Sequence, residues 1–294
     1  MFRHLRVKSQ PHKVAPDPGE LSLQRLVGDF TLPISIRALN GLPDNARQRI
    51  YHNLIPPSLL TRLNINPINW LSAGGEQQVQ VTAAPDSGMV TVSVRQATSP
   101  DACFFLELAD NSLNGIDLNM LLLNDPVSPR FGTDFDDHGV STQFGAARRN
   151  LAEEARAIQA GLAPGQIRSS LGASALVFQQ LDAFLAFAAH QAVFLEPLTY
   201  ASAWVFERRD FAYVRGHRLM DEIHREFQPG GRLHQALDGS TSFRQPGQWQ
   251  TVRGRAWAIH DGILDVLEQR WNGLRMVKQV GRHAGVSTFP DAIY

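Results

Sequence analysis

Histidine and carboxylate side chains recur at helical spacing near residue 220. His217, Asp221 and His224 stand at positions i, i+4 and i+7, so a helix would carry all three on one face. Two imidazoles and a carboxylate on one face can coordinate a divalent metal or transfer protons. The sequence therefore predicts a metal or proton-transfer site on a helix that begins near Gly216.

The same residues also fit an ordinary solvent-exposed helix face. In that interpretation Asp221 pairs with a neighbouring arginine and both imidazoles are hydrated. The sequence contains no His-Glu-x-x-His signature, and a complete site would need a further ligand from elsewhere. The available side chains are those of His234, His260, Asp261 and His283. The sequence leaves open whether a divalent metal is bound.

A long polar segment rich in glycine and arginine follows this predicted helix. Arg244, Arg253 and Arg255 lie within it. Guanidinium groups offer paired donors that suit a carboxylate or phosphate, and glycines let the backbone approach a ligand closely. We therefore expect these arginines to hold a small anionic molecule. The alternative is a solvated loop with glycines at its turns.

His260 and Asp261 end this polar segment and have the composition of an acid/base pair. Together with the arginines they support the hypothesis of an enzyme that acts on a small anionic substrate. The competing hypothesis is a non-catalytic small-molecule-binding or assembly protein, in which the histidines are incidental. Signatures of dinucleotide-binding, P-loop and α/β-hydrolase proteins are absent from the sequence.

A short motif supports a third, more remote hypothesis. The pattern Ala203-x-x-Phe206-Glu207-x-x-x-Phe211 resembles the helix-to-strand corner of GCN5-related N-acetyltransferases, which is usually Ala-x-x-x-Tyr-Glu-x-x-Gly-Phe. It covers about ten residues, has Asp210 where that family has glycine, and places the alanine one residue closer to the aromatic residue. The resemblance implies an acyltransferase-like activity with acetyl-CoA as the donor.

The acetyl-CoA loop of that family should follow a strand. In this sequence the glycine-containing segment 163–166 follows a predicted helix instead. The motif at 203–211 is therefore the part of the sequence that carries the resemblance.

The elements that must position these residues change in type along the chain. From residue 77 the hydrophobic period is two, and turn-forming segments separate the apolar runs, which is typical of an antiparallel meander. The predicted strands are 79–81, 90–94, 104–108 and 116–123.

Helical spacing dominates after residue 146. Asn150 and Glu153 resemble a capping box. We expect helices at 150–161, from Pro164 through Leu185, at 197–207, at 216–227 and at 257–267. Shorter alternating runs predict strands at 211–214 and 274–280, the second of which could join the earlier sheet.

The sequence thus predicts an α+β fold with an antiparallel sheet at 77–123 packed against a mainly helical C-terminal half. The expected regions are a tail at 1–20, a helical and sheet region at 21–130, and a helical region at 146–294 with a polar loop at 228–250. The two larger regions could form one continuous domain.

Composition limits the partners and the compartment. The 28 basic and 28 acidic residues cancel, so no overall charge favours nucleic acid or an anionic membrane. The single Cys103 excludes an intramolecular disulfide and fits a reducing compartment, and the first residues are too polar for a signal peptide. We expect a cytoplasmic protein without nucleic-acid or membrane partners. The sequence gives no indication of its oligomeric state.

Overall fold

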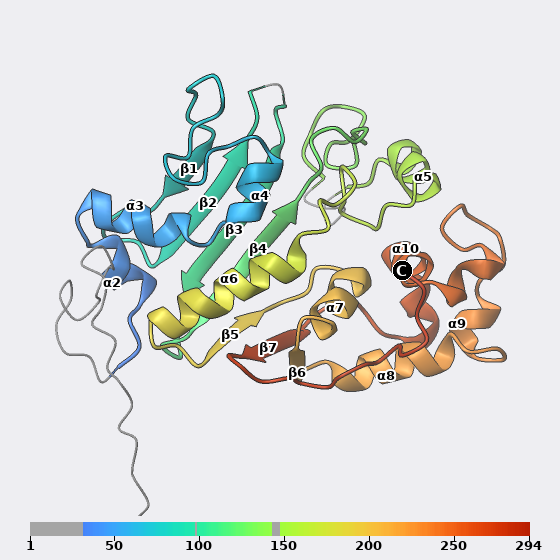
Figure 1. Cartoon of the computed structure of the whole chain (residues 1–294). Coiled ribbons are helices and arrows are strands. Elements are labelled where there is room, and N and C mark those ends of the chain that lie inside the picture. The colour runs from blue at the N-terminus through green and yellow to red at the C-terminus, as the bar shows by residue number, and fades with distance from the viewer. Residues whose placement is uncertain (1–31, 98, 143–147) are drawn as a thin grey trace, which may run out of the picture. The chain divides into compact units, whose positions relative to one another are not determined.

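The computed structural model describes residues 32–97, 99–142 and 148–294 (Figure 1). The chain divides into two units, Met1–Leu32 and Pro33–Tyr294, and the description below concerns the second. The predicted tail at 1–20 lies outside the described residues. Within the described parts of the chain, no helix has the length and apolar character needed to cross a membrane.

A seven-stranded sheet organises this second unit, which has an α+β fold (Figure 1). The strand order is β1-β2-β3-β4-β5-β7-β6. The strands are β1 (Val79–Thr82), β2 (Met89–Arg95), β3 (Ala102–Asp110), β4 (Ile116–Leu123), β5 (Ala192–Leu195), β6 (Phe211–Arg215) and β7 (Arg275–Gln279). The predicted meander is confirmed, and so are the predicted strands at 211–214 and 274–280.

The sheet is mixed rather than purely antiparallel. Strand β4 pairs with β5 in parallel, and β5 and β6 each pair with β7 in antiparallel orientation. Strands from both predicted halves of the chain therefore belong to one sheet. Strand β5 was not predicted, because its four residues are all apolar and lie between helices, so they carry no alternation and no turn signal.

Helices fill most of the remaining described chain. They are α2 (Ile36–Asn40), α3 (Asp44–His52), α4 (Pro57–Arg62), α5 (Leu151–Gln159), α6 (Ser174–Phe187), α7 (Tyr200–Glu207), α8 (His217–Glu226), α9 (Arg232–Gln235) and α10 (Val252–His260). The segments Pro246–Gln250 and Ile263–Leu267 form short 3₁₀ helices. The Asn150 side chain accepts a hydrogen bond from the Glu153 amide, so the predicted cap is present.

Helix α6 begins ten residues later than predicted. The segment 169–171 is instead extended beside the end of β4, where the Leu171 amide donates to the Leu123 carbonyl at 3.1 Å. Gly172 then adopts a φ of +67°, which favours glycine and turns the chain into the helix. Hydrogen bonds to a distant strand thus decide the start of α6, and the local sequence pattern does not contain that information.

The main core lies on one face of the sheet. Figure 1 shows α4 and α6 crossing the front of β2, β3 and β4. Alternate strand residues such as Val92, Phe104 and Val193 are buried on this face, and α6 contributes Phe178 and Leu181. The sheet is therefore held by an amphipathic layer of helices, as the period-two strands predict.

A lobe formed by two long connections packs beside the sheet. It contains the described residues of the connection from β4 to α6 (124–142 and 148–173) and the connection from β6 to β7 (216–274). Its own apolar cluster consists of Phe131, Ala157, Leu162, Phe243 and Trp257. The predicted polar loop at 228–250 lies in this lobe and contains α9 and a 3₁₀ helix.

Candidate functional site

The three residues predicted as metal ligands do not converge. His217 Nδ1 lies 3.7 Å from Asp221 Oδ2, with both side chains about half exposed, and the imidazole stacks on Tyr213. His224 points instead into the protein, where its Nδ1 lies 3.2 Å from Nη1 of Arg255. Among the residues that the structure describes, no group of three or more His, Cys, Asp or Glu side chains is placed to hold a metal ion.

His224 has a cationic neighbour where a metal ligand would need an open coordination position. Burial lowers the pKa of His224, and the charge of Arg255 lowers this pKa further. Because a guanidinium has no acceptor atom, it must donate to Nδ1, which therefore carries a lone pair. His224 is thus a neutral acceptor for a buried arginine.

Arg255 is fully buried, and no carboxylate in the described part of the chain pairs with it. Its Nε donates to the Trp249 carbonyl at 2.6 Å, and its guanidinium carbon lies 3.5 Å from the centre of the Phe289 ring and 5.2 Å from that of Phe227. The burial lowers the pKa of Arg255 and raises that of its neighbour Tyr200 to about 12. Aromatic faces and neutral acceptors therefore replace the usual counterion.

The other two arginines predicted to hold an anion lie in different surroundings. The guanidinium of Arg253 lies 4.3 Å from the centre of the Tyr294 ring. Arg244 Nε lies 2.9 Å from Asp261 Oδ2, and its Nη2 donates to the Asp261 carbonyl at 2.6 Å. The structure thus separates the three predicted anion-binding side chains.

His260 has a carboxylate partner that is not the predicted Asp261. Its Nε2 lies 3.2 Å from Oε1 of Glu154, and the other oxygen of Glu154 accepts two bonds from Arg149 at 2.5 and 2.8 Å. Asp261 accepts from Arg149 at 2.8 Å and from Arg244. We call these five residues the α5–α10 polar cluster.

Sequence reasoning missed two members of this cluster, Glu154 and Arg149. Glu154 is separated from His260 by 106 residues, so no spacing rule relates them. One available signal was the position of Glu154 on the same helix as the apolar Ala157, which is fully buried. A carboxylate on a buried helix face needs cationic or donor partners, and that requirement points to residues elsewhere in the chain.

Both carboxylates of the cluster are ionised at neutral pH. Burial raises the pKa of Glu154, but the hydrogen bonds from His260 and Arg149 outweigh it, so the pKa lies below its ordinary value. Burial likewise raises the pKa of Asp261, and its bonds from Arg149 and Arg244 outweigh that effect. Two guanidinium groups therefore balance two carboxylates.

Helix α10 connects the chain segments that follow β4 and β5. Its middle contacts α7, the helix after β5, through Arg255 and Tyr200. Its end contacts Glu154 of α5 through His260, and Trp257 Nε1 donates to the Leu162 carbonyl, which follows α5, at 2.7 Å. The polar cluster consequently belongs to the lobe that the connections β4–α6 and β6–β7 form.

In the described part of the chain, strands β4 and β5 form only two residue pairs. These are Ile116 with Val193 and Asp117 with Phe194. Farther along β4, the segment 169–171 occupies the same strand edge at Leu123. The stretch between them, Leu118–Leu122, is hereafter the β4 window, about 16 Å long at the usual rise per residue.

Within the β4 window, the backbone amide and carbonyl of Leu121 point away from β3. The Asn124 amide donates to the Cys103 carbonyl of β3, whereas the Leu123 carbonyl accepts from Leu171 on the opposite edge. Alternate residues of an antiparallel strand direct their amide and carbonyl to the same side of the strand. Leu121 and Leu123 are two residues apart, so the amide and carbonyl of Leu121 point to the same side as the Leu123 carbonyl, away from β3. No β-ladder partner on that edge is found for Leu121 among the described residues.

The window combines this backbone edge with apolar side chains and an irregular register. The register shifts between Glu107 and Leu108, so that Asn119 of β4 is an extra, bulged residue. Met120 to Leu123 are half-buried. Near the ends of β4 and β5, Leu176 of α6 and Leu198 before α7 are exposed apolar residues. An extended, partly apolar ligand would match these features.

The N-terminus of α6 offers donors beside the end of β4. The preceding Ala173 provides no side-chain cap, so the first amides of the helix lack that partner. Arg62 donates to the Leu171 carbonyl at 2.6 Å, and Arg209 Nε donates to Ser174 Oγ at 3.1 Å. Helix amides without a side-chain cap, together with two guanidinium groups, favour an anion such as a diphosphate.

The helix-to-strand corner implied by the family resemblance is present between α7 and β6. Asp210, at the position of the family's glycine, has a φ of +67°. Glu207 is buried and accepts hydrogen bonds from Tyr213 at 2.6 Å and from the Thr288 hydroxyl at 2.7 Å and amide at 2.9 Å. The left-handed conformation explains why glycine suits this position.

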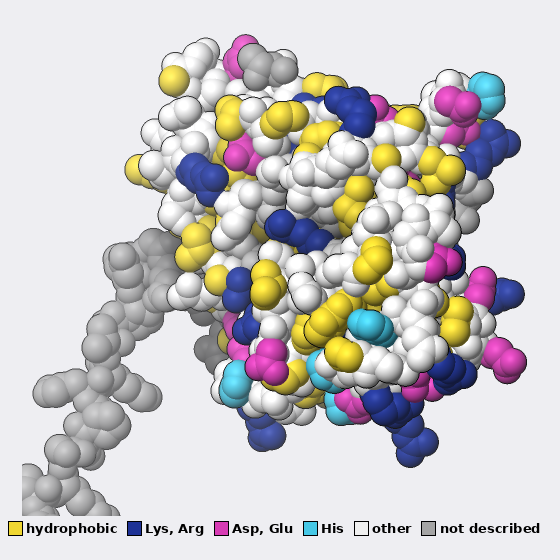
Figure 2. All heavy atoms as spheres, turned by 90° about the vertical axis from the view of Figure 1, so that its right-hand side faces the viewer, with side chains coloured by type: hydrophobic (Ala, Val, Ile, Leu, Met, Phe, Trp, Pro, Cys, Tyr) yellow, Lys and Arg dark blue, Asp and Glu magenta, His cyan; other side chains and the backbone are white. Residues whose placement is uncertain are grey.

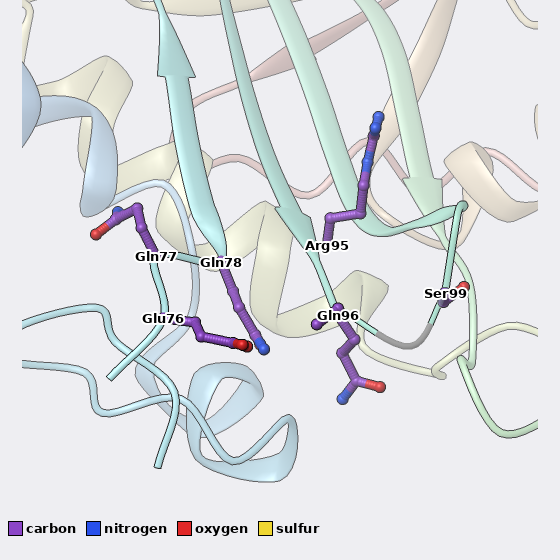
Figure 3. Close-up of a pocket in the computed structure, with 7 residues that line it drawn as sticks. Glu76, Gln77, Gln78, Arg95, Gln96 and Ser99 are labelled. Atoms are coloured by element: carbon purple, nitrogen blue, oxygen red, sulfur yellow. The ribbon is translucent and has the colours of Figure 1, made fainter. Parts of the chain in front are cut away.

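Two other surface features lie outside this arrangement. A polar cavity of about 330 Å³ lies beside β1 and the end of β2 and is lined by Glu76, Gln77, Gln78, Arg95, Gln96, Ala97 and Ser99. Figure 3 shows the side chain of Arg95 pointing away from those of Glu76 and Gln78. Figure 2 shows hydrophobic atoms along the middle of the face on the lobe side.

Comparison with known proteins adds no identification: no family model, no curated protein and no solved structure matches this chain. The functional argument therefore depends on the site geometry.

Proposed function

We propose that this chain transfers an acyl group from a coenzyme A thioester to an amine or hydroxyl acceptor. The observation that carries the proposal is the parallel pair β4 and β5, which pairs at Ile116 and Asp117 and then leaves the β4 window without a strand partner in the described chain. The proposal joins the remote acyltransferase hypothesis to the hypothesis of a small anionic substrate, because coenzyme A is itself an anion.

The pantetheine arm of coenzyme A suits the β4 window. It is an extended chain with two amide groups, and an extended ligand can hydrogen-bond to a free strand edge as an added strand does. The amide and carbonyl of Leu121 supply one donor and one acceptor on that edge. The half-buried side chains of Met120 to Leu123 would contact the methylene groups.

The diphosphate of the donor suits the start of α6. Arg62 and Arg209 lie there beside helix amides that have no side-chain cap. The loop 169–173 lies beside the end of β4, where the Leu171 amide donates to the Leu123 carbonyl, although 45 residues separate it from that strand in sequence. Because residues 124–168 lie between β4 and this loop in the sequence, the sequence pattern does not show that the two are adjacent.

The arrangement of the sheet places a parallel pair at its centre. The strand order is β1-β2-β3-β4-β5-β7-β6, and β4 and β5 are the parallel neighbours. The corner at 203–211 has the left-handed residue that the family motif requires. A fold alone does not establish an activity, so the window and the donors around α6 must carry the chemistry.

Acyl transfer needs a polarised thioester carbonyl and a deprotonated acceptor. The bulge at Asn119 takes a backbone residue out of the β3 ladder, and a freed amide can donate to the oxygen that gains charge in the tetrahedral intermediate. The acceptor nitrogen or oxygen then bonds to the carbonyl carbon as the carbon–sulfur bond breaks. The thiol of coenzyme A leaves.

The proposal is tested by calorimetric titration with coenzyme A. Leu121→Pro removes the outward amide of the window without removing a β3 hydrogen bond, because Leu121 faces away from β3. Val81→Pro is the matched control: the Gln78 carbonyl bonds to Arg95 of β2, so Val81, three residues later, faces the outer edge of the sheet.

The native chain and Val81→Pro are expected to bind coenzyme A alike, whereas Leu121→Pro should lose about tenfold in affinity or more. Thermal melts check that both variants fold. A native chain that does not bind coenzyme A, or equal binding by Leu121→Pro, would contradict the proposal. Binding without release of free thiol from acetyl-CoA and ethanolamine would instead favour the non-catalytic binding protein.

A further inference from the structure

Glu207 and Arg255 are buried charged side chains, and neither forms an ion pair within the described chain. Glu207, the last residue of α7, only accepts hydrogen bonds: from the Tyr213 hydroxyl at 2.6 Å and from the Thr288 hydroxyl and amide at 2.7 and 2.9 Å. Nη2 of Arg255 is buried and has no hydrogen-bond partner among the described residues. A buried charge is costly unless an opposite charge or a full set of hydrogen bonds compensates it, so each group favours a ligand of opposite charge.

Adjacent residues of one segment cover both charges. Thr288 donates to Glu207 through its hydroxyl and its amide. The ring centre of the next residue, Phe289, lies 3.5 Å from the guanidinium carbon of Arg255. Because consecutive Cα atoms are about 3.8 Å apart, both charged groups lie within reach of this dipeptide. Tyr200, on the same helix as Glu207, also approaches Arg255, with its hydroxyl 3.5 Å from Nη1. Residues 288–289 therefore cover a site with a carboxylate on one side and a guanidinium group on the other.

The segment that carries this dipeptide, 281–294, is hereafter the C-terminal strap. It contains no helix or strand, and apart from its two buried residues, 288 and 289, it is exposed or only partly buried. Figure 1 shows the end of the chain beside α10. The Phe289 carbonyl accepts from Trp204 Nε1 at 3.4 Å, and the Val252 amide donates to the Ile293 carbonyl at 2.8 Å. A segment with few buried residues opens at a lower free-energy cost than the core does.

The strap complements one of the two charges better than the other. Thr288 gives Glu207 two hydrogen-bond donors, as an ammonium group would. Phe289 gives Arg255 the face of an aromatic ring, and the hydrogens of Nη2 have no acceptor among the described residues. A ligand that carries an ammonium group and a carboxylate would complement both charges, because its carboxylate accepts from the guanidinium group.

We propose that the C-terminal strap covers a binding site for a small zwitterion of the amino-acid class, in which Glu207 binds the ammonium group and Arg255 the carboxylate. The ligand displaces Thr288 and Phe289 from these two groups. As many covalent bonds join the Thr288 amide nitrogen to the Phe289 ring as join the nitrogen of ε-aminocaproate to its carboxyl carbon, so ε-aminocaproate is the probe. This inference goes beyond the proposed acyl transfer and does not depend on it.

The first test is calorimetric titration of the full chain with ε-aminocaproate, and with caproate and hexylamine, which each lack one of the two charges. The zwitterion is expected to bind about tenfold more tightly than either control compound, or better. Glu207→Gln and Arg255→Met should each weaken its binding about tenfold or more, whereas Arg156→Met, which removes an exposed guanidinium group from α5, should bind it like the native chain. Equal binding of caproate, or native affinity in Arg255→Met, would overturn the inference.

The second test is hydrogen exchange of the native chain, which needs no variant to fold. Saturating ε-aminocaproate is expected to speed exchange of the Thr288 amide about tenfold or more, because the ligand removes its hydrogen bond to Glu207, while amides of α5 exchange at an unchanged rate. Binding with unchanged or slower exchange at Thr288 would overturn the inference. A native chain that binds coenzyme A but not ε-aminocaproate would also overturn it and leave the proposed function intact.

Discussion

The middle and the C-terminal end of α10 place charged groups in opposite surroundings. In the middle of the helix, Arg255 is buried among aromatic rings and neutral acceptors, and no described carboxylate pairs with it. Five residues later, His260 belongs to a cluster in which Glu154 and Asp261 balance two guanidinium groups. The contrast separates a cation held by aromatic rings and neutral acceptors from guanidinium groups that are balanced by ion pairs.

The largest effect on the free energy of unfolding is expected from truncating the buried Arg255. Arg255→Ala removes the contacts with Phe289 and leaves a cavity, so the free energy of unfolding should fall by about 3–5 kcal/mol. Arg255→Met should cost less, because it fills the space and no longer buries a cation. Arg253, on the same helix, lies over the half-exposed Tyr294 ring, so Arg253→Ala should cost about 1 kcal/mol or less. Urea unfolding measures all three, and equal losses would break the comparison.

Truncation in the charge-balanced cluster should cost somewhat less. Glu154→Ala leaves Arg149 without its closest carboxylate and is expected to lower the free energy of unfolding by about 3 kcal/mol. In a double-mutant cycle with Arg149→Ala, the two losses should not add, since each variant removes the same ion pair. Additive losses would show that the two side chains do not stabilise the fold together.

The two regions should also lose stability over different pH ranges. The folded-state pKa of His224 is lowered, so its contribution is present above the unfolded value of about 6.5 and is lost as the pH falls below it. The folded-state pKa values of Glu154 and Asp261 are also lowered, so their contributions are present above about 4 and are lost at lower pH.

Urea midpoints between pH 8 and pH 3 measure this difference. His224→Gln should reduce the loss between about pH 6.5 and pH 5 and leave the loss below pH 4 unchanged, whereas Asp261→Asn should do the reverse. The variants are needed because other groups contribute in the same pH ranges. The pKa of His52 is lowered like that of His224, and the pKa of Glu153 is lowered like those of Glu154 and Asp261. A His224→Gln variant with the native pH profile would contradict the account of His224 as a neutral acceptor for Arg255.

The smallest expected effect concerns the rim of the polar cluster. The hydroxyl of Thr241 donates to Asp261 at 3.1 Å, where Arg149 and Arg244 already bind the carboxylate. Thr241→Val should therefore lower the free energy of unfolding by about 1 kcal/mol or less. A loss as large as that of Glu154→Ala would show that Asp261, rather than Glu154, organises the cluster.

The sequence predicted elements whose pattern is local and missed relations that cross long stretches of chain. The period-two runs of the meander and the cap at Asn150 are confirmed, because burial on one face and backbone capping follow from neighbouring residues. The parallel strand β5 and the late start of α6 depend on β4, which lies far away in sequence. Predicted site residues show the same limit. His260 was predicted to pair with the adjacent Asp261, whereas its imidazole lies 3.2 Å from Glu154, which is 106 residues away in sequence.

Hydrogen exchange of β4 with and without coenzyme A tests the central claim most directly. The account predicts that coenzyme A slows exchange of the amides in Leu118–Leu122, foremost that of Leu121, while amides of the outer edge strand Val79–Thr82 exchange at an unchanged rate. Coenzyme A that binds without protecting the β4 window, or a window that is already protected to the same extent in the free chain, would contradict it.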